Sequence, residues 1–80
     1  PMSIGYSQRL VEANKKASVK LLGVALGRLC IRQGIPVMLV AEELEVSRAT
    51  IYNWFWGTTA PDNKRSARIA LLMQKLKRKK

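Results

Sequence analysis

The sequence predicts an all-α fold of four to five short helices. Apolar residues recur every three or four positions over several stretches, which is the spacing of helices with one buried face. No stretch alternates apolar and polar residues as a half-buried strand does. The chain has 80 residues, of which 48% are hydrophobic, so we expect one small domain with a modest core.

Three parts are expected along the chain. Residues 1–16 form either a basic N-terminal arm or a short helix capped by Ser7. Residues 17–76 form the folded domain. Residues 77–80 form a basic tail, and the charge run KLKRKK that contains it is expected to be frayed.

The first helix of the domain is expected over residues 17–33. Its inward positions are predicted to be Leu21, Leu22, Ala25, Leu26 and Leu29. Gly34 supplies a residue that tolerates a positive φ at the helix end. Gly23 and Gly27 inside the helix each cost about 1 kcal/mol relative to alanine. We therefore expect another helix to pack closely there, in preference to a bend or a dimer seam.

Two shorter helices follow, over residues 36–44 and 47–56. Pro36 opens the first, and its inward residues are predicted to be Val37, Val40, Ala41 and Leu44. Ser47 is a favourable N-cap for the second. Val46 and Ile51 stand at the spacing of a hydrophobic staple across that cap.

The stretch GTTAPDN, residues 57–63, consists of turn-forming residues. Gly57 is expected to reverse the chain, and Asp62 or Asn63 can cap a last helix. The inner side of this helix is predicted to carry Ala67, Ile69, Leu72, Met73 and Leu76.

The charge balance favours a polyanionic partner. Fifteen Lys and Arg oppose five Asp and Glu, which gives a net charge of +10. Such a surface attracts nucleic acid or an anionic membrane. No apolar run reaches the roughly 18 residues of a membrane span, and the first residues lack a signal-peptide pattern. We therefore expect no membrane partner.

The sequence offers little for catalysis. It has one cysteine, Cys30, and no histidine, which excludes an internal disulfide framework, a zinc finger and Cys/His catalysis. It also lacks a glycine-rich phosphate loop and a carboxylate pair away from one helix end. We therefore expect no enzymatic activity, no metal and no cofactor.

The helix over residues 47–56 carries two contrasting faces. Its hydrophobic side is predicted to contain Ile51, Trp54 and Phe55. Its polar side is predicted to contain Arg48, Ala49, Tyr52 and Asn53. Arg48 can bond guanine O6 and N7, and Asn53 can bond adenine N6 and N7. Ala49 leaves room for close approach of the bases.

Other residues of this helix suit the nucleic-acid backbone. Tyr52 can reach a base edge or a phosphate, and the hydroxyls of Ser47 and Thr50 can bond phosphates. Trp56 falls on the open side of the helix end. In order of preference, it packs under the following loop, makes a dimer contact, or stacks near the DNA backbone.

The order of these elements resembles a helix-turn-helix. A short helix ends at Leu44, a tight link follows, and a capped helix begins at Ser47. Ala41 matches the small residue at which the two helices approach. The stretch WFWGTTAP matches the W-x-x-G-x-x-x-P ending that is common in the Cro/C1-type (XRE) repressor family. The resemblance spans about residues 17–76 and implies a lambda-repressor-like fold of phage or bacterial origin. It also implies a cytoplasmic, nucleoid-associated protein in a bacterial or infected host cell.

Two residues depart from the family pattern. Glu45 stands at the link position that usually holds glycine, so its backbone must be strained or the turn must differ. Val37 replaces the glutamine that often opens the first motif helix and touches phosphate. The resemblance implies base or backbone contacts from Ser47, Arg48, Ala49, Tyr52 and Asn53.

Further cations are expected at the DNA backbone. Lys64, Arg65 and Arg68 occupy the first turns of the last helix, where the helix dipole disfavours positive charge. Contact with phosphates would explain this placement. The acidic residues Glu42, Glu43 and Glu45 are expected to point away from DNA. The basic tail, from Lys75 onward, is expected to add salt-dependent attraction without sequence preference.

The function predicted by the motif and the charge is sequence-specific binding of double-stranded DNA by a repressor-like transcriptional regulator, with the helix over residues 47–56 in the major groove. The resemblance leaves open a homodimer on a pseudo-palindrome. It also leaves open contact of Glu42 and Glu43 with RNA polymerase. The alternative is a small phage protein that binds host RNA polymerase or another protein through the same fold.

Overall fold

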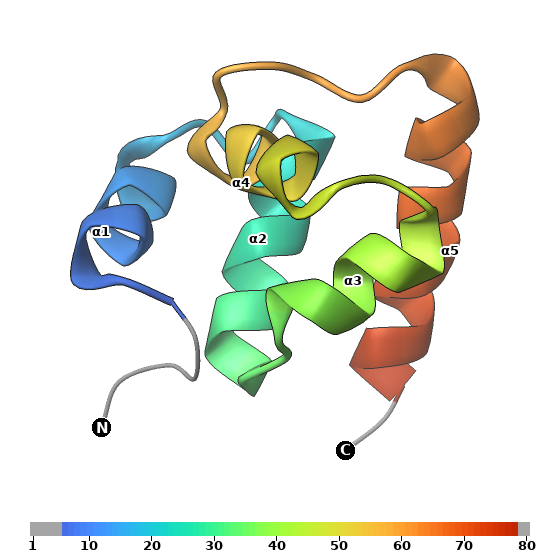
Figure 1. Ribbon diagram of the computed structural model, residues 1–80, viewed down its shortest axis with the longest axis horizontal. Helices are drawn as coiled ribbons and strands as arrows, with labels where there is room; N and C mark the ends of the chain where they lie inside the picture. The colour runs from blue at the N-terminus through green and yellow to red at the C-terminus, as the bar shows by residue number, and fades with distance from the viewer. Residues whose placement is uncertain (1–5, 79–80) are drawn as a thin grey trace.

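The computed structural model describes residues 6–78 of the chain, which contain five α-helices joined by short links (Figure 1). They are α1 (Gln8–Lys16), α2 (Leu22–Gln33), α3 (Val37–Leu44), α4 (Arg48–Trp56) and α5 (Asn63–Arg78). No strand occurs in this range, which confirms the predicted all-α class. Within the same range no helix is long and apolar enough to cross a membrane. Residues 1–5 of the expected arm or helix and 79–80 of the expected tail lie outside the described residues.

Side-chain caps fix where three helices start. In each case a side-chain oxygen accepts a hydrogen bond from the backbone N–H three residues further on: Ser7 from Leu10 at 3.1 Å, Ser47 from Thr50 at 3.2 Å, and Asp62 from Arg65 at 2.9 Å. Each bond satisfies an N–H group that the helix itself leaves without a partner. Residues 8–16 are therefore the capped helix, not an extended arm, and Asp62 is the cap of α5.

Left-handed residues end α2, α3 and α4. Gly34 and Gly57 have φ values of 70° and 84°, and Glu45 has a φ of 59°. After each of them, the next backbone N–H bonds the carbonyl five residues back: Ile35 to Cys30, Val46 to Ala41, and Thr58 to Asn53. Glu45 is the only non-glycine residue among residues 6–78 with a positive φ. Of the two alternatives predicted for this position, a strained backbone or a different turn, the structure has the strained backbone.

The start of α2 differs from the prediction, because the helix begins at Leu22 and not at Ala17. The Ser18 hydroxyl accepts a hydrogen bond from the Lys20 N–H, and the Ser18 carbonyl accepts one from the Leu21 N–H. These local bonds offer the backbone a turn that competes with a helix. As a result Leu21 is exposed rather than inward. The residues of α2 that are buried are Gly23, Val24, Leu26, Gly27, Leu29 and Cys30.

The two glycines inside α2 allow α4 to pack directly on it. A Cβ added at Gly23 would lie 2.7 Å from the Trp54 Cβ, and one added at Gly27 would lie 2.7 Å from the Phe55 Cγ. Real side chains do not approach this closely. The close packing of another helix, which the sequence predicts for this stripe, is therefore confirmed.

Helices α3 and α5 also contribute to the core, as do Tyr6 and Leu10. All four predicted inward residues of α3 are buried: Val37, Val40, Ala41 and Leu44. On α5, Ile69 is fully buried, and Leu72, Met73 and Leu76 pack partly buried against the core. Ala67 is exposed, contrary to the prediction. The helix continues to Arg78, so the described part of the run KLKRKK is helical and not frayed.

Candidate nucleic-acid interface

Helix α4 combines a buried face with an exposed one. Ile51 and Phe55 are 0% exposed and Trp54 is 4% exposed. The side chains that share the outer face of the helix are exposed: Arg48, Ala49, Tyr52 and Asn53. Packing of the inner face fixes the rotation of α4 about its axis. The outer face is therefore presented in one orientation, with no segment of residues 6–78 burying it.

The first turn of α4 is ordered by its own hydroxyl groups. The Ser47 Oγ accepts a hydrogen bond from the Thr50 backbone N–H, and the two side-chain hydroxyls lie 3.0 Å apart in a second hydrogen bond. Both groups are at the protein surface. Each hydroxyl keeps further capacity for an acceptor or donor, so contact with a phosphate stays chemically possible for both residues.

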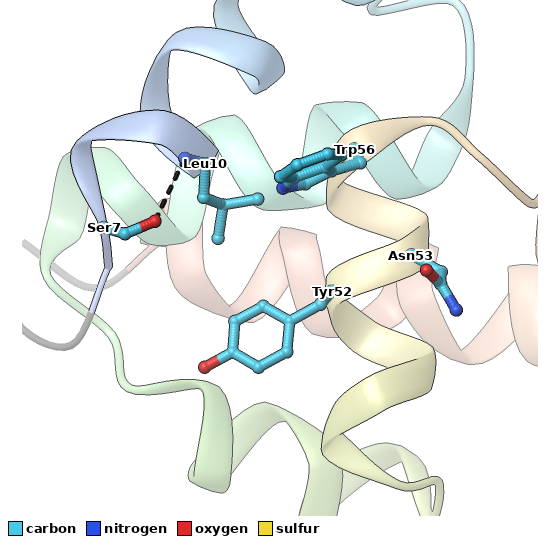
Figure 2. Close-up of a pocket in the computed structure, with 5 residues that line it drawn as sticks. All are labelled: Ser7, Leu10, Tyr52, Asn53 and Trp56. Atoms are coloured by element: carbon cyan, nitrogen blue, oxygen red, sulfur yellow. Dashed lines mark hydrogen bonds between the residues drawn. The ribbon is translucent and has the colours of Figure 1, made fainter.

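A cleft lies between α1 and the outer face of α4 (Figure 2). Its volume is about 370 Å³, and it is lined by Ser7, Leu10, Tyr52, Asn53 and Trp56. Figure 2 shows the Leu10 side chain between Ser7 and the Trp56 indole, and the Tyr52 and Asn53 side chains leaving α4 in different directions. Trp56 is 44% exposed. The indole of Trp56 therefore shares a cleft with Leu10 of α1. The sequence instead favours packing under the following loop as the first alternative.

A buried amide ties α1 to the other helices of this region. The Asn14 Nδ2 donates to the Phe55 carbonyl at 2.8 Å and to the Val24 carbonyl at 3.1 Å. Asn14 is 2% exposed, and no other polar or charged residue of the described range is classed as buried. The Arg28 guanidinium donates to the carbonyls of Asn14 and Lys15, both at 2.9 Å. These bonds hold α1 against α2 and the C-terminal turn of α4.

The three cations expected at the DNA backbone have different surroundings. Lys64 is exposed and has no ion-pair partner among residues 6–78. The Arg65 guanidinium lies 3.3 Å from the carboxylate of its own helix cap, Asp62. The Arg68 guanidinium lies 3.6 Å from the Glu45 carboxylate. Both pairs are exposed enough for water and salt to weaken them, so their cations can exchange a carboxylate for a phosphate.

Two acidic side chains, Glu43 of α3 and Glu45 of the link after it, face α5. Glu45 pairs with Arg68, and Glu43 lies 3.9 Å from the Lys75 ammonium. Lys75 is thus partly neutralised, whereas Lys77 and Arg78 have no ion pair within the described part of the chain. The attraction to polyanions that the sequence predicts for the basic tail must then come mainly from residues after Lys75.

The sequence assigns no function to the region around α1. Lys15, Lys16 and Lys20 are exposed there, and none of them forms an ion pair with a described residue. The attachment of the end of α1 to α4 depends on Asn14, whose contacts lie 10 and 41 residues away along the chain. The only signal in the sequence is the basic run NKKASVK.

The surface around α4 presents polar and basic groups. Among residues 6–78, no three His, Cys, Asp or Glu side chains are grouped as metal ligands. What the surface presents is an arginine, an amide and a phenol on one rigid helix, with cations on neighbouring elements. Comparisons of the chain with protein-family models, with curated proteins and with solved structures find no match, so no family is assigned to it.

Proposed function

We propose that this protein binds double-stranded DNA with sequence preference and acts as a repressor-like transcriptional regulator, with α4 in the major groove. The observation that carries the proposal is the outer face of α4. Arg48 and Asn53, two side chains that pair bidentately with purines, are exposed on a helix whose opposite face is buried. A major groove is wide enough for one such helix.

The surroundings of α4 support the same function. Helix α3 precedes it after a link whose only left-handed residue is Glu45, the order expected of a helix-turn-helix. The net charge of +10 favours a polyanion. Lys64 at the start of α5 is free to contact a phosphate, which fixes position without reading sequence.

The test separates base contacts from backbone contacts. DNA selected from a random library by the wild-type protein is compared with a scrambled duplex, at two salt concentrations. Arg48→Ala should lose about 1–3 kcal/mol on the selected duplex and relax the preference at one base pair. Lys64→Ala should weaken binding to both duplexes alike. Arg32→Ala is the matched control, because it removes an exposed charge in the last turn of α2.

Two outcomes would overturn the proposal. One is an equal, sequence-independent effect of Arg48→Ala and Lys64→Ala, which would remove the assignment of a base contact. The other is intact cellular function in the double variant Arg48→Ala, Asn53→Ala together with its loss in Trp56→Ala. That result would favour a protein partner. Footprints over a promoter, as opposed to upstream of it, would identify repression.

A further inference from the structure

Helix α1 and the turn after it are fixed beside the C-terminal half of α4. The Asn14 side chain bonds the Phe55 carbonyl at 2.8 Å. A Cβ placed on Gly57 would lie 3.5 Å from the Ala17 Cβ and 3.6 Å from the Leu21 Cδ1. The last residues of α1 and the turn over residues 17–21 therefore touch the end of α4.

Helix α1 also reaches the level of the outer face of α4. Ser7 and Leu10 line one cleft together with Tyr52, Asn53 and Trp56 (Figure 2). A helix with its side chains is about 10–12 Å across, and the major groove is about 12 Å wide. The groove that accepts α4 has no room for α1 as well. Helix α1 must then lie over the sugar-phosphate backbone at one edge of the groove.

The cations in the last turn of α1 and in the turn that follows it are free to bind phosphate. Lys15, Lys16 and Lys20 are exposed, and no ion pair occupies them among residues 6–78. The one acidic residue of α1, Glu12, accepts a hydrogen bond from the Gln8 side chain at 3.0 Å. On the α5 side, by contrast, carboxylates neutralise cations at three places.

We infer that Lys15, Lys16 and Lys20 form a second contact surface for the DNA backbone, which we call the α1 clamp. The inference rests on the proposed function, because it needs α4 in the major groove. Helices α1 and α5 lie on opposite sides of α4 (Figure 1). The α1 clamp therefore binds the strand across the groove from the one that Lys64 meets.

The test uses the full chain and the selected and scrambled duplexes. The triple variant Lys15→Ala, Lys16→Ala, Lys20→Ala removes the α1 clamp. The control variant Arg32→Ala removes an exposed charge in the last turn of α2, to which no DNA contact is assigned. Circular dichroism checks that both variants are folded.

The expected result is a change in salt dependence. The slope of log K against log salt is negative, and each lost phosphate contact reduces its magnitude by about 0.9, so loss of the α1 clamp should reduce it by about 2 to 3. Affinity at low salt should fall roughly tenfold or more on both duplexes, with base preference unchanged. The control variant Arg32→Ala should leave this slope nearly unchanged. If each charge removed from the α1 clamp changes the slope no more than Arg32→Ala does, the inference is overturned.

Phosphate ethylation distinguishes this inference from the proposed function. In the wild type, ethylation should interfere on both strands that border the α4 site. In the α1 clamp variant, interference should disappear on one strand only. If Arg48→Ala relaxes base preference but the α1 clamp variant keeps interference on both strands, only the clamp is wrong. If the wild-type protein has no base preference, the proposed function is wrong, and the clamp inference is withdrawn with it.

Discussion

Glu45 holds a backbone conformation that favours glycine. Its φ of 59° and ψ of 46° lie in the left-handed region, where an L side chain costs roughly 1–2 kcal/mol. The link needs this conformation because the Val46 N–H must reach the Ala41 carbonyl, at 3.1 Å, before α4 begins. The side chain also places a carboxylate 3.6 Å from Arg68. Glu45 is therefore both the strained residue of the link and the source of the negative charge next to Arg68 of α5.

Glu45→Gly should stabilise the fold and tighten DNA binding. Relief of the left-handed strain outweighs the extra entropy of glycine in the unfolded chain, so we expect a gain of about 0.5–1 kcal/mol in the free energy of unfolding. The exposed pair with Arg68 contributes little that would be lost. Urea unfolding measures the stability. Binding to the selected duplex at low salt measures the effect of freeing Arg68.

Glu45→Gln is the matched control. It removes the charge and keeps a side chain in the left-handed region. DNA binding should therefore tighten as in Glu45→Gly, while the free energy of unfolding stays near that of the wild type. A gain in stability as large as that of Glu45→Gly would show that charge, and not backbone strain, limits this link.

At the scale of the elements, the position of α1 depends on one buried amide. Asn14 donates to carbonyls of α2 and α4, and its side-chain amide needs these partners because it is buried. The α1–α4 cleft and the α1 clamp both depend on this position. Asn14 is therefore a structural residue whose loss should alter how α1 borders the outer face of α4.

Asn14→Ala should destabilise the protein by about 2–3 kcal/mol, because it removes two buried hydrogen bonds and leaves a small cavity. Asn14→Asp should cost at least as much, because an ionised carboxylate cannot donate to either carbonyl. Gln8→Ala, which removes an exposed bond of α1, should change stability by less than about 0.5 kcal/mol. Chemical denaturation measures all three. A loss in Asn14→Ala no larger than in Gln8→Ala would contradict the assigned role.

Local signals explain which elements the sequence predicts well. Ser47, Gly34 and Gly57 act on neighbouring backbone groups, so the limits of α4 and the end of α2 follow from a few residues. The start of α2 was mispredicted because the Ser18 turn competes with continuation of the apolar spacing. Ala67 has the right spacing for the core, but α5 is rotated so that Ile69 is the residue that is fully buried.

Part of the candidate site could also be predicted from local signals, and part could not. The exposed face of α4 could be predicted because Ile51, Trp54 and Phe55 require the opposite face to be buried. The α1 clamp could not, since a polar residue such as Asn14 in a short helix is typical of an exposed position. The pair between Arg68 and Glu45 joins residues distant in sequence, and only the packing of α5 beside the link brings them together.

At the scale of the whole molecule, repulsion among the excess positive charges destabilises the compact state. A core without charged groups adds nothing to this repulsion. The net charge is +10, and only three ion pairs form among residues 6–78. The Cys30 thiol and the Tyr6 phenol, the two buried groups among residues 6–78 that could ionise, stay protonated because burial raises their pKa values. Burial raises the pKa of the Cys30 thiol from 9.0 to about 12. Burial is also the main cause that raises the pKa of the Tyr6 phenol, whose hydroxyl donates to the Ile35 carbonyl.

These shifts predict a loss of stability in alkali. Above about pH 9 the unfolded chain gives up the Cys30 proton, while the native protein keeps it until about pH 12. The unfolded state then binds fewer protons than the native state, so the free energy of unfolding falls as the pH rises through this window. Below pH 9 the stabilisation is fully present. Tyr6 adds to the decline above its ordinary pKa of 10.0.

The variant Cys30→Ala isolates the contribution of the Cys30 thiol to the pH dependence of stability. Lysines also titrate in this window, but they do so in the variant and the wild type alike. The variant should be less stable at pH 7, because it leaves a cavity where Cys30 was fully buried, yet its stability should fall less steeply between pH 9 and 11. Denaturation at each pH under reducing conditions gives the two slopes. Equal slopes would mean that the Cys30 thiol ionises as readily in the folded protein as in the unfolded chain. In that case the core around α2 would have to admit water.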